Sequence, residues 1–125
     1  MPANAPRDRS AYFRNELEQY YLLCRDIHAN PLEINSSYAG ALGLPQFMPS
    51  SWRKYAVDFD GEGRIDLIHS PADAIGSVAR YFAEHGWQAN QPVVSATRGQ
   101  LRETESLEPG IESKYSLSAL KQAGL

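Results

Sequence analysis

The stretch SSYAGALGLPQFMPSSW, residues 36–52, is the most informative part of this chain for its fold, because it combines very small side chains with large aromatic ones. Ten of its seventeen residues are Gly, Ala, Ser or Pro, while Tyr38 and Phe47 carry flat rings. Gly40 and Gly43 allow backbone conformations closed to other residues. We therefore expect a loop in which either two segments pack tightly or a ligand approaches the main chain.

Hydrophobic periodicity on both sides of this loop predicts a mainly α-helical chain. Ser10 is expected as the N-cap of the first helix, and Ser70 as that of the third. The four expected helices cover about residues 10–28, 49–55, 70–86 and 116–123. The segment 92–97, PVVSAT, has the composition of a strand.

Each of the two longer helices carries an apolar stripe that we expect to be buried. In the first helix the stripe consists of Phe13, Leu17, Tyr20, Tyr21, Cys24 and Ile27. In the third helix it consists of Ile75, Val78, Ala79 and Phe82. Glu16 and Glu18 lie off the first stripe, which predicts solvated carboxylates.

Length and composition indicate one domain and exclude several classes of protein. A chain of 125 residues with 12 basic and 15 acidic side chains, and no run of like charge, does not suggest a nucleic-acid partner. The lone Cys24 excludes an internal disulfide. No apolar run approaches the roughly 20 residues of a membrane span. We expect a monomer, with residues 1–9 as a disordered or cut end.

The loop also has the chemistry of a sugar site. The planar amide of Gln46 matches an N-acetyl group or paired hydroxyls, and the rings of Tyr38, Phe47 and Trp52 offer faces for a sugar. The alternative is that Phe47 and Trp52 simply pack in the core.

Two segments, SSYAGALGLPQFMPSSWRKYAVDFDGEGRIDL and SPADAIGSVARYFAEHGW, resemble the membrane-bound lytic murein transglycosylase B family. The resemblance runs from about Tyr12 to Leu125. It implies part of a lysozyme-like core and cleavage of the MurNAc–GlcNAc β-1,4 bond of peptidoglycan, with a 1,6-anhydro product. It also implies a periplasmic location, with the parent as an outer-membrane lipoprotein.

The resemblance carries three site residues over to this chain. The family's motif serine matches Ser37, its substrate-binding glutamine matches Gln46, and an active-site tyrosine matches Tyr81. The family's catalytic glutamate lies in a segment like GVETxxG upstream of the GALG loop, and residues 1–125 contain no such segment. Glu33 is the remaining substitute, although a carboxylate in its polar turn is usually exposed.

The resemblance therefore implies that residues 10–125 are a partial catalytic domain that binds glycan without cleaving it. Two other interpretations remain open from the residues alone. One is a non-catalytic peptidoglycan-binding module, and the other is a small calcium-binding protein whose aromatic loop is only core packing.

The acidic segment DFDGEGRID, residues 58–66, has the spacing of an EF-hand-like loop. Asp58, Asp60 and Glu62 occupy positions 1, 3 and 5, and the carbonyl of Arg64 would supply position 7. We therefore predict a structural Ca²⁺ site, with a solvated acidic turn as the alternative.

The end of this acidic loop departs from the EF-hand pattern. His69 stands at position 12, where an EF-hand has a bidentate glutamate. Asp73 would close the loop 58–73 from the next helix, as a later aspartate does in the resembling family. The same carboxylate is also placed to cap the third helix, and the two roles compete for its oxygens.

Overall fold

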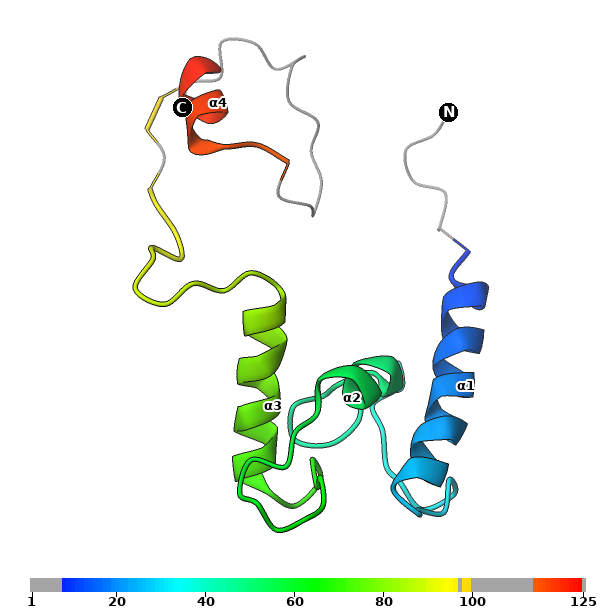
Figure 1. The fold of residues 1–125 in the computed structure, drawn as a ribbon. Coiled ribbons are helices and arrows are strands. Elements are labelled where there is room, and N and C mark those ends of the chain that lie inside the picture. Colours follow the sequence, from blue (N-terminus) through cyan, green and yellow to red (C-terminus); the bar gives the residue numbers. More distant parts are fainter. Residues whose placement is uncertain (1–7, 97, 100–113, 125) are drawn as a thin grey trace. The chain divides into compact units, whose positions relative to one another are not determined.

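The computed structural model describes residues 8–96, 98–99 and 114–124. These residues form four helices and no strand, which confirms the mainly α fold class (Figure 1). The helices are α1 (Ser10–Asp26), α2 (Pro49–Tyr55), α3 (Pro71–Glu84) and α4 (Leu117–Gln122). Two compact units are present, residues 1–88 with α1 to α3 and residues 89–125 with α4.

The helix boundaries follow the expected capping signals, with one correction. At α3, the Ser70 hydroxyl accepts a hydrogen bond from the backbone N–H of Asp73 at 3.2 Å. Ser10, however, is the first residue of α1 and not its N-cap. The carboxylate of Asp8 accepts from the Ser10 N–H at 2.9 Å, so it does what a capping side chain would do.

The strand expected over 92–97 is wrong for its described part. Residues 92–96 are irregular, and Val93 and Val94 are exposed. A single extended segment needs a partner to satisfy its backbone groups, and the described residues offer none. Thr97 lies outside the described residues, as do residues 1–7 of the expected disordered end.

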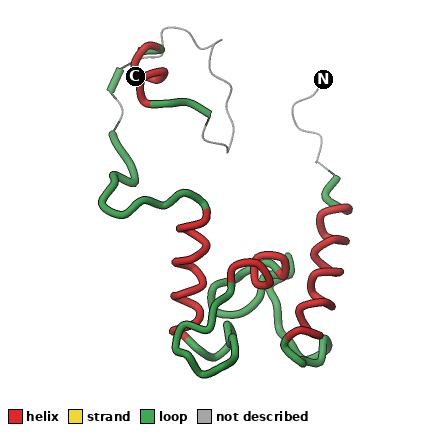
Figure 2. The backbone as a smooth tube through the Cα atoms, viewed as in Figure 1, coloured by secondary structure: helices red, strands yellow, loops and turns green. Residues whose placement is uncertain are grey.

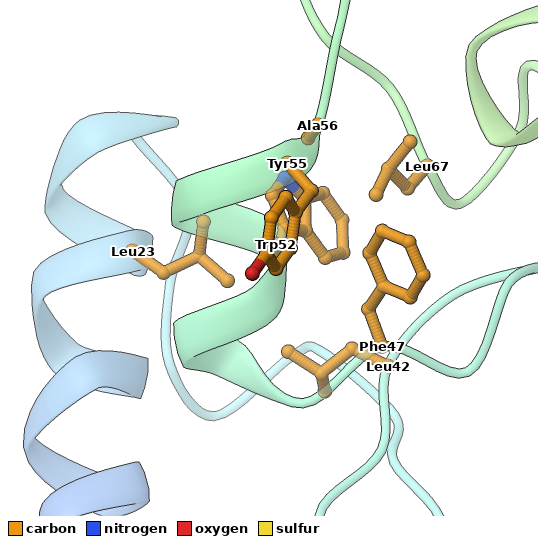
Figure 3. Packing of buried hydrophobic residues seen from close by; sticks show 7 residues of the cluster. All are labelled: Leu23, Leu42, Phe47, Trp52, Tyr55, Ala56 and Leu67. Carbon is orange, nitrogen blue, oxygen red and sulfur yellow. The ribbon is translucent and has the colours of Figure 1, made fainter. Parts of the chain in front are cut away.

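The core lies around α2, which contacts both α1 and α3. Trp52 and Tyr55 of this short helix are buried among residues from α1 and the surrounding loops (Figure 3). The buried cluster contains Leu23, Leu42, Phe47, Trp52, Tyr55, Ala56 and Leu67. A seven-residue helix is marginal alone, so this packing is what stabilises α2.

The apolar stripe expected for α1 is buried only toward its C-terminal end. Cys24 is buried as expected, whereas Phe13, Leu17 and Tyr21 are exposed. The first turns of α1 extend beyond α2 in the view of Figure 2, and Phe13 and Leu17 line a cavity there instead of packing in the core.

Glu16 corrects the prediction of a solvated carboxylate, since only 5% of the residue is exposed. Its two oxygens accept hydrogen bonds from the N–H (3.0 Å) and the hydroxyl (2.6 Å) of Ser50, in the first turn of α2. The start of a helix has free N–H groups, and the Glu16 carboxylate satisfies one of them. The periodicity of α1 alone contains no information about this contact.

The buried face of α3 is also different from the expected one. Ile75 is 69% and Phe82 54% exposed, and Ala79 is exposed too. The buried residues of the helix are Asp73, Ala74, Gly76 and Ser77. The segment after α2 packs on this face through hydrogen bonds, and such close contact requires small or polar side chains.

No helix in the described ranges combines the length and the apolar character that crossing a membrane requires.

Candidate functional site

The small-residue loop is closed around Leu42, which is buried in the core. Isolated antiparallel bridges join Leu42 to Ser36 on one side and to Phe47 on the other. Leu42 and Phe47 exchange two backbone hydrogen bonds, of 2.8 and 3.1 Å. One buried side chain therefore anchors the loop 36–47, and its polar residues are held on a rigid support.

Gly43 brings this loop against the segment that precedes α3. A Cβ atom at Gly43 would lie 2.5 Å from the carbonyl oxygen of Leu67, and its φ of +66° is in the left-handed region. The next residue, Leu44, donates its N–H to the same carbonyl at 2.8 Å. The sequence left open whether two segments pack tightly in this loop or a ligand approaches its main chain. At Gly43 the structure shows tight packing of two segments.

Gln46 is exposed and has an unusual backbone conformation for a residue with a side chain. Its φ is +53°, and such conformations typically cost about 1–3 kcal/mol and occur often at functional sites. Its Nε2 donates to the carbonyl of Gly43 at 3.0 Å, whereas no described residue donates to its Oε1. The amide is therefore oriented by the loop and keeps an acceptor for a ligand.

Ser37 and Tyr38 lie on the other side of the same loop. The hydroxyl of Ser37 accepts from the N–H of Ala41 at 3.0 Å, which orients it within the turn. The ring of Tyr38 is fully exposed. It lines a cavity of about 390 Å³ between α1 and the loop, together with residues that include Tyr20 and Met48. Gln46 and Tyr81 do not line this cavity.

Two of the rings expected to contact sugar are in the core. Trp52 is 3% exposed, so the expectation that its ring faces a ligand is wrong. Phe47 is 8% exposed and packs 5.6 Å, between ring centroids, from Tyr81 of α3. Phe47 thus joins the loop of Gln46 to the half-buried Tyr81, and its own contact with glycan stays a prediction.

Glu33 is exposed, as expected for its polar turn. Its carboxylate accepts a hydrogen bond from the side-chain amide of Asn30 at 3.0 Å. The Asn30 Oδ1 in turn accepts from the N–H of Leu32 at 3.0 Å. The hydrogen bond of Glu33 therefore stabilises the turn that follows α1.

The acidic loop brings three of its predicted ligands together. Carboxylate oxygens of Asp58, Asp60 and Asp73 lie within 4.8 Å of one another, and this group could hold a metal ion. Glu62 is not in the group. The side chain of Arg64, whose carbonyl was the predicted ligand, is exposed. An all-oxygen donor set of this kind suits Ca²⁺.

Asp58 organises the turn from inside. Its carboxylate accepts hydrogen bonds from the N–H groups of Gly61 (2.8 Å), Glu62 (3.1 Å) and Gly63 (2.7 Å). Gly61 and Gly63 have positive φ values, which this sharp turn requires. A Cβ at either glycine would meet nothing within 4 Å.

Asp73 connects the acidic loop to α3. The residue is 1% exposed, and its two oxygens accept from the N–H groups of Asp66 (2.8 Å) and Phe59 (2.7 Å). These backbone hydrogen bonds, that of Asp66 first, lower the pKa of the Asp73 carboxyl. The Asp73 carboxylate thus bonds to the backbone of the acidic loop, while the Ser70 side chain caps the helix. The role of Asp73 as a Ca²⁺ ligand stays a prediction.

Asp66 stabilises the turn into α3. Burial opposes ionisation of its carboxyl, but the N–H groups of His69 and Ile68 and the His69 ring donate to it, and together they lower its pKa. His69, at position 12 of the loop, thus bonds to Asp66, with 3.2 Å between Nδ1 and the carboxylate.

Comparison with known proteins places this geometry in a family. The family model described as Transglycosylase SLT domain matches residues 3–125. Membrane-bound lytic murein transglycosylase B of Escherichia coli is 49% identical over 122 residues, which are 98% of this chain and 32% of the relative. The chain therefore spans about a third of that relative.

Solved structures agree with the fold. The soluble lytic transglycosylase SltB1 of Pseudomonas aeruginosa is 48% identical with a TM-score of 0.81, over 95% of this chain and 40% of that one. The E. coli lytic transglycosylase Slt35 in complex with calcium is 48% identical with a TM-score of 0.74, over 96% and 37%. The lysozyme-like fold class is thereby confirmed, and this chain belongs to the transglycosylase SLT domain family.

Proposed function

We propose that residues 10–125 are part of the catalytic domain of a peptidoglycan lytic transglycosylase and supply part of its glycan-binding site. The observation that carries the proposal is the strained, exposed Gln46, whose chain neighbour Phe47 packs against the half-buried Tyr81. Family membership supports it, because Ser37, Gln46 and Tyr81 are the three positions that match the family motifs. The ligand would be a glycan strand that contains N-acetylated sugars, bound by a monomeric chain.

We propose that residues 1–125 bind this glycan without cleaving it. A positioned general acid contributes typically about 10²- to 10⁴-fold to such a reaction, and the acid must hold a proton near the glycosidic oxygen. Both oxygens of Glu16 accept hydrogen bonds from Ser50, so this carboxyl is engaged within the fold between α1 and α2. Glu33 is exposed within its turn. Neither the Glu16 nor the Glu33 carboxyl is therefore placed to donate a proton to the glycosidic oxygen of a bound glycan.

We propose that Asp58, Asp60 and Asp73 hold a structural Ca²⁺ ion, with Glu62 and the carbonyl of Arg64 as further ligands. The calcium complex of Slt35 and the clustering of the three carboxylates support this role. The ion would offset the repulsion between the carboxylates and fix the loop against α3. Catalysis by the family's glutamate would not use it.

The proposed location of the parent protein is the periplasm, with attachment to the outer membrane. The E. coli relative is named a membrane-bound murein transglycosylase, and an enzyme of that kind must reach peptidoglycan.

Co-sedimentation with purified peptidoglycan tests the proposal, with the soluble fraction analysed by mass spectrometry. We expect the chain to sediment with peptidoglycan and to release no anhydro-muropeptides, while E. coli transglycosylase B releases them in parallel. Gln46→Ala should reduce sedimentation at an unchanged melting temperature, because an exposed amide has little packing to lose.

Two outcomes would contradict the proposal. Failure of the unmodified chain to bind peptidoglycan would remove the binding role. Anhydro products from the unmodified chain that disappear in Glu33→Gln would instead show that Glu33 is a catalytic acid.

A further inference from the structure

Four aromatic rings lie near the ring of Tyr81, and one of them is its chain neighbour Phe82, with 6.2 Å between centroids. Phe47 lies 5.6 Å and Tyr55 5.1 Å from the Tyr81 ring between ring centroids, the latter in an edge-to-face arrangement with an interplanar angle of 79°. His85 stacks on it at 4.0 Å with an angle of 27°. Phe47 and Tyr55 belong to the core, so His85 is the neighbour that covers Tyr81 from the solvent side.

Hydrogen bonds to the backbone carbonyl of Tyr81 fix the position of the His85 ring. Its Nδ1 lies 2.6 Å from the carbonyl oxygen of Tyr81, and its own N–H donates to the same oxygen at 3.1 Å. A carbonyl oxygen only accepts, so Nδ1 must carry a proton. The imidazole is therefore tied to the residue on which it stacks, one helical turn away.

The hydroxyl of Tyr81 remains available. No described residue forms a hydrogen bond with it, and the described chain has no buried side-chain oxygen or nitrogen without a partner, so this hydroxyl reaches solvent. A ring held by four aromatic neighbours with a free hydroxyl at its end is suited to a ligand contact of defined geometry, because little rotational freedom remains to be lost on binding.

We propose that His85 is a positioning residue, which holds the Tyr81 ring in the orientation that contacts the glycan. The inference rests on the proposed function, because it takes Tyr81 to be a glycan-contacting residue. His85 acts in two ways. Its imidazole ring covers the open side of the Tyr81 ring, and the hydrogen bond from its Nδ1–H to the Tyr81 carbonyl holds the imidazole in place. Neither action requires His85 itself to touch the sugar.

The test combines glycan affinity with an observation of the tyrosine ring. Affinity is measured by titration with a trimer of N-acetylglucosamine, and Tyr81 is followed by NMR in a chain with ¹³C-labelled tyrosine rings. His85→Ala should weaken binding about three- to tenfold, in line with the loss of one aromatic pair, and should shift the Tyr81 resonances. His85→Phe keeps a stacked ring without the Nδ1–H, so it should recover a large part of the affinity.

His28→Ala is the matched control, because His28 follows the end of α1 and lines a cavity beside the acidic loop that includes neither Tyr81 nor His85. It should leave both the affinity and the Tyr81 resonances unchanged. Unaltered binding and unaltered Tyr81 resonances in His85→Ala would overturn the positioning role. So would a His85→Phe chain that keeps its melting temperature and yet binds far more weakly than the unmodified chain, a comparison that does not depend on the folding of His85→Ala. An unmodified chain that does not bind the trimer would overturn the proposed function itself.

Discussion

The loops 36–47 and 58–66 both contain glycines at positive φ, yet the structure holds them in different ways. The first loop is fixed by apolar burial, with Leu42 in the core and Gly43 pressed against the carbonyl of Leu67. The second is fixed by carboxylates, with Asp58 inside the turn and Asp73 behind it. Its glycines face open space.

The difference shows that a glycine at positive φ has two separable functions. In the acidic loop it supplies only the conformation, because nothing occupies the space of a Cβ atom at Gly61 or Gly63. In the small-residue loop Gly43 supplies conformation and space together. The acidic loop should therefore respond to protons and cations, and the small-residue loop to changes in side-chain volume.

The largest effect is expected for Gly43→Ala. Left-handed strain of about 1–2 kcal/mol and overpacking of about 1–3 kcal/mol should together lower the free energy of unfolding by about 2–5 kcal/mol. Gly63→Ala, which has a φ of +87° but open surroundings, should lose only the strain of about 1–2 kcal/mol. Urea denaturation measures both, and equal losses would break the comparison between the loops.

Calcium should stabilise the chain through the acidic loop. An ion at one hundred times its Kd that binds only the folded state adds about 2.7 kcal/mol to the free energy of unfolding. The melting temperature should therefore rise with millimolar calcium and fall again with a chelator. The rise should be absent in the double variant Asp58→Ala and Asp60→Ala and retained in Gln46→Ala. A rise of the same size in the double variant would exclude this site.

In calcium-free buffer, acid should weaken the acidic loop first. The folded pKa values of Asp73 and Asp66 are below the ordinary value of about 3.9, so the unfolded chain takes up protons first as the pH falls. Their contribution to stability is complete above that value and is lost as the pH falls through the lowered pKa values.

Urea denaturation between pH 6 and pH 2 measures this dependence. Asp73→Asn should flatten the decline of stability below about pH 4, whereas the non-titrating change Gln46→Ala should preserve it. A decline of the same slope in Asp73→Asn would mean that other groups control acid unfolding.

The smallest change in stability is expected at Gln46. Two substitutions there separate the effect of the backbone conformation from the effect of the side-chain amide. Gln46→Ala keeps the strain of the positive φ, while Gln46→Gly relieves it and should stabilise by up to about 1 kcal/mol. Both should lose glycan affinity to a similar degree, because both lack the amide. Retained affinity in Gln46→Gly would show that the backbone, and not the side chain, makes the contact.

Much of the fold could be predicted from the sequence because its signals are local. Ser70 with Pro71 marks the start of α3, the apolar spacing marks α1, and proline in the first turn marks α2. The pairing of Asp58 with Asp60 was predictable as well, since ligand spacing in a loop depends mainly on local geometry, whereas Asp73 of the next helix was expected from the family resemblance. The three motif positions came from family resemblance.

The remaining features are decided between segments that are distant in the sequence. Glu16 has an unremarkable position in α1, and its burial depends on Ser50 lying 34 residues later in the chain. Trp52 has the same ring whether it faces a sugar or the core, and only packing determines that it is buried. The stacking of His85 on Tyr81 needs both the helical turn and the rings of the core beneath it.

By itself, the sequence determined approximately where the helices begin and end, which loop carries carboxylates, and which family the chain resembles, because capping, turn chemistry and motif spacing operate over a few residues. Only the tertiary structure decided which side of α3 is buried, that the Asp73 carboxylate bonds to the acidic loop, and that Gly43 must remain a glycine. The physical reason is that burial and close backbone contact are properties of pairs of segments, and a single segment does not specify its partner.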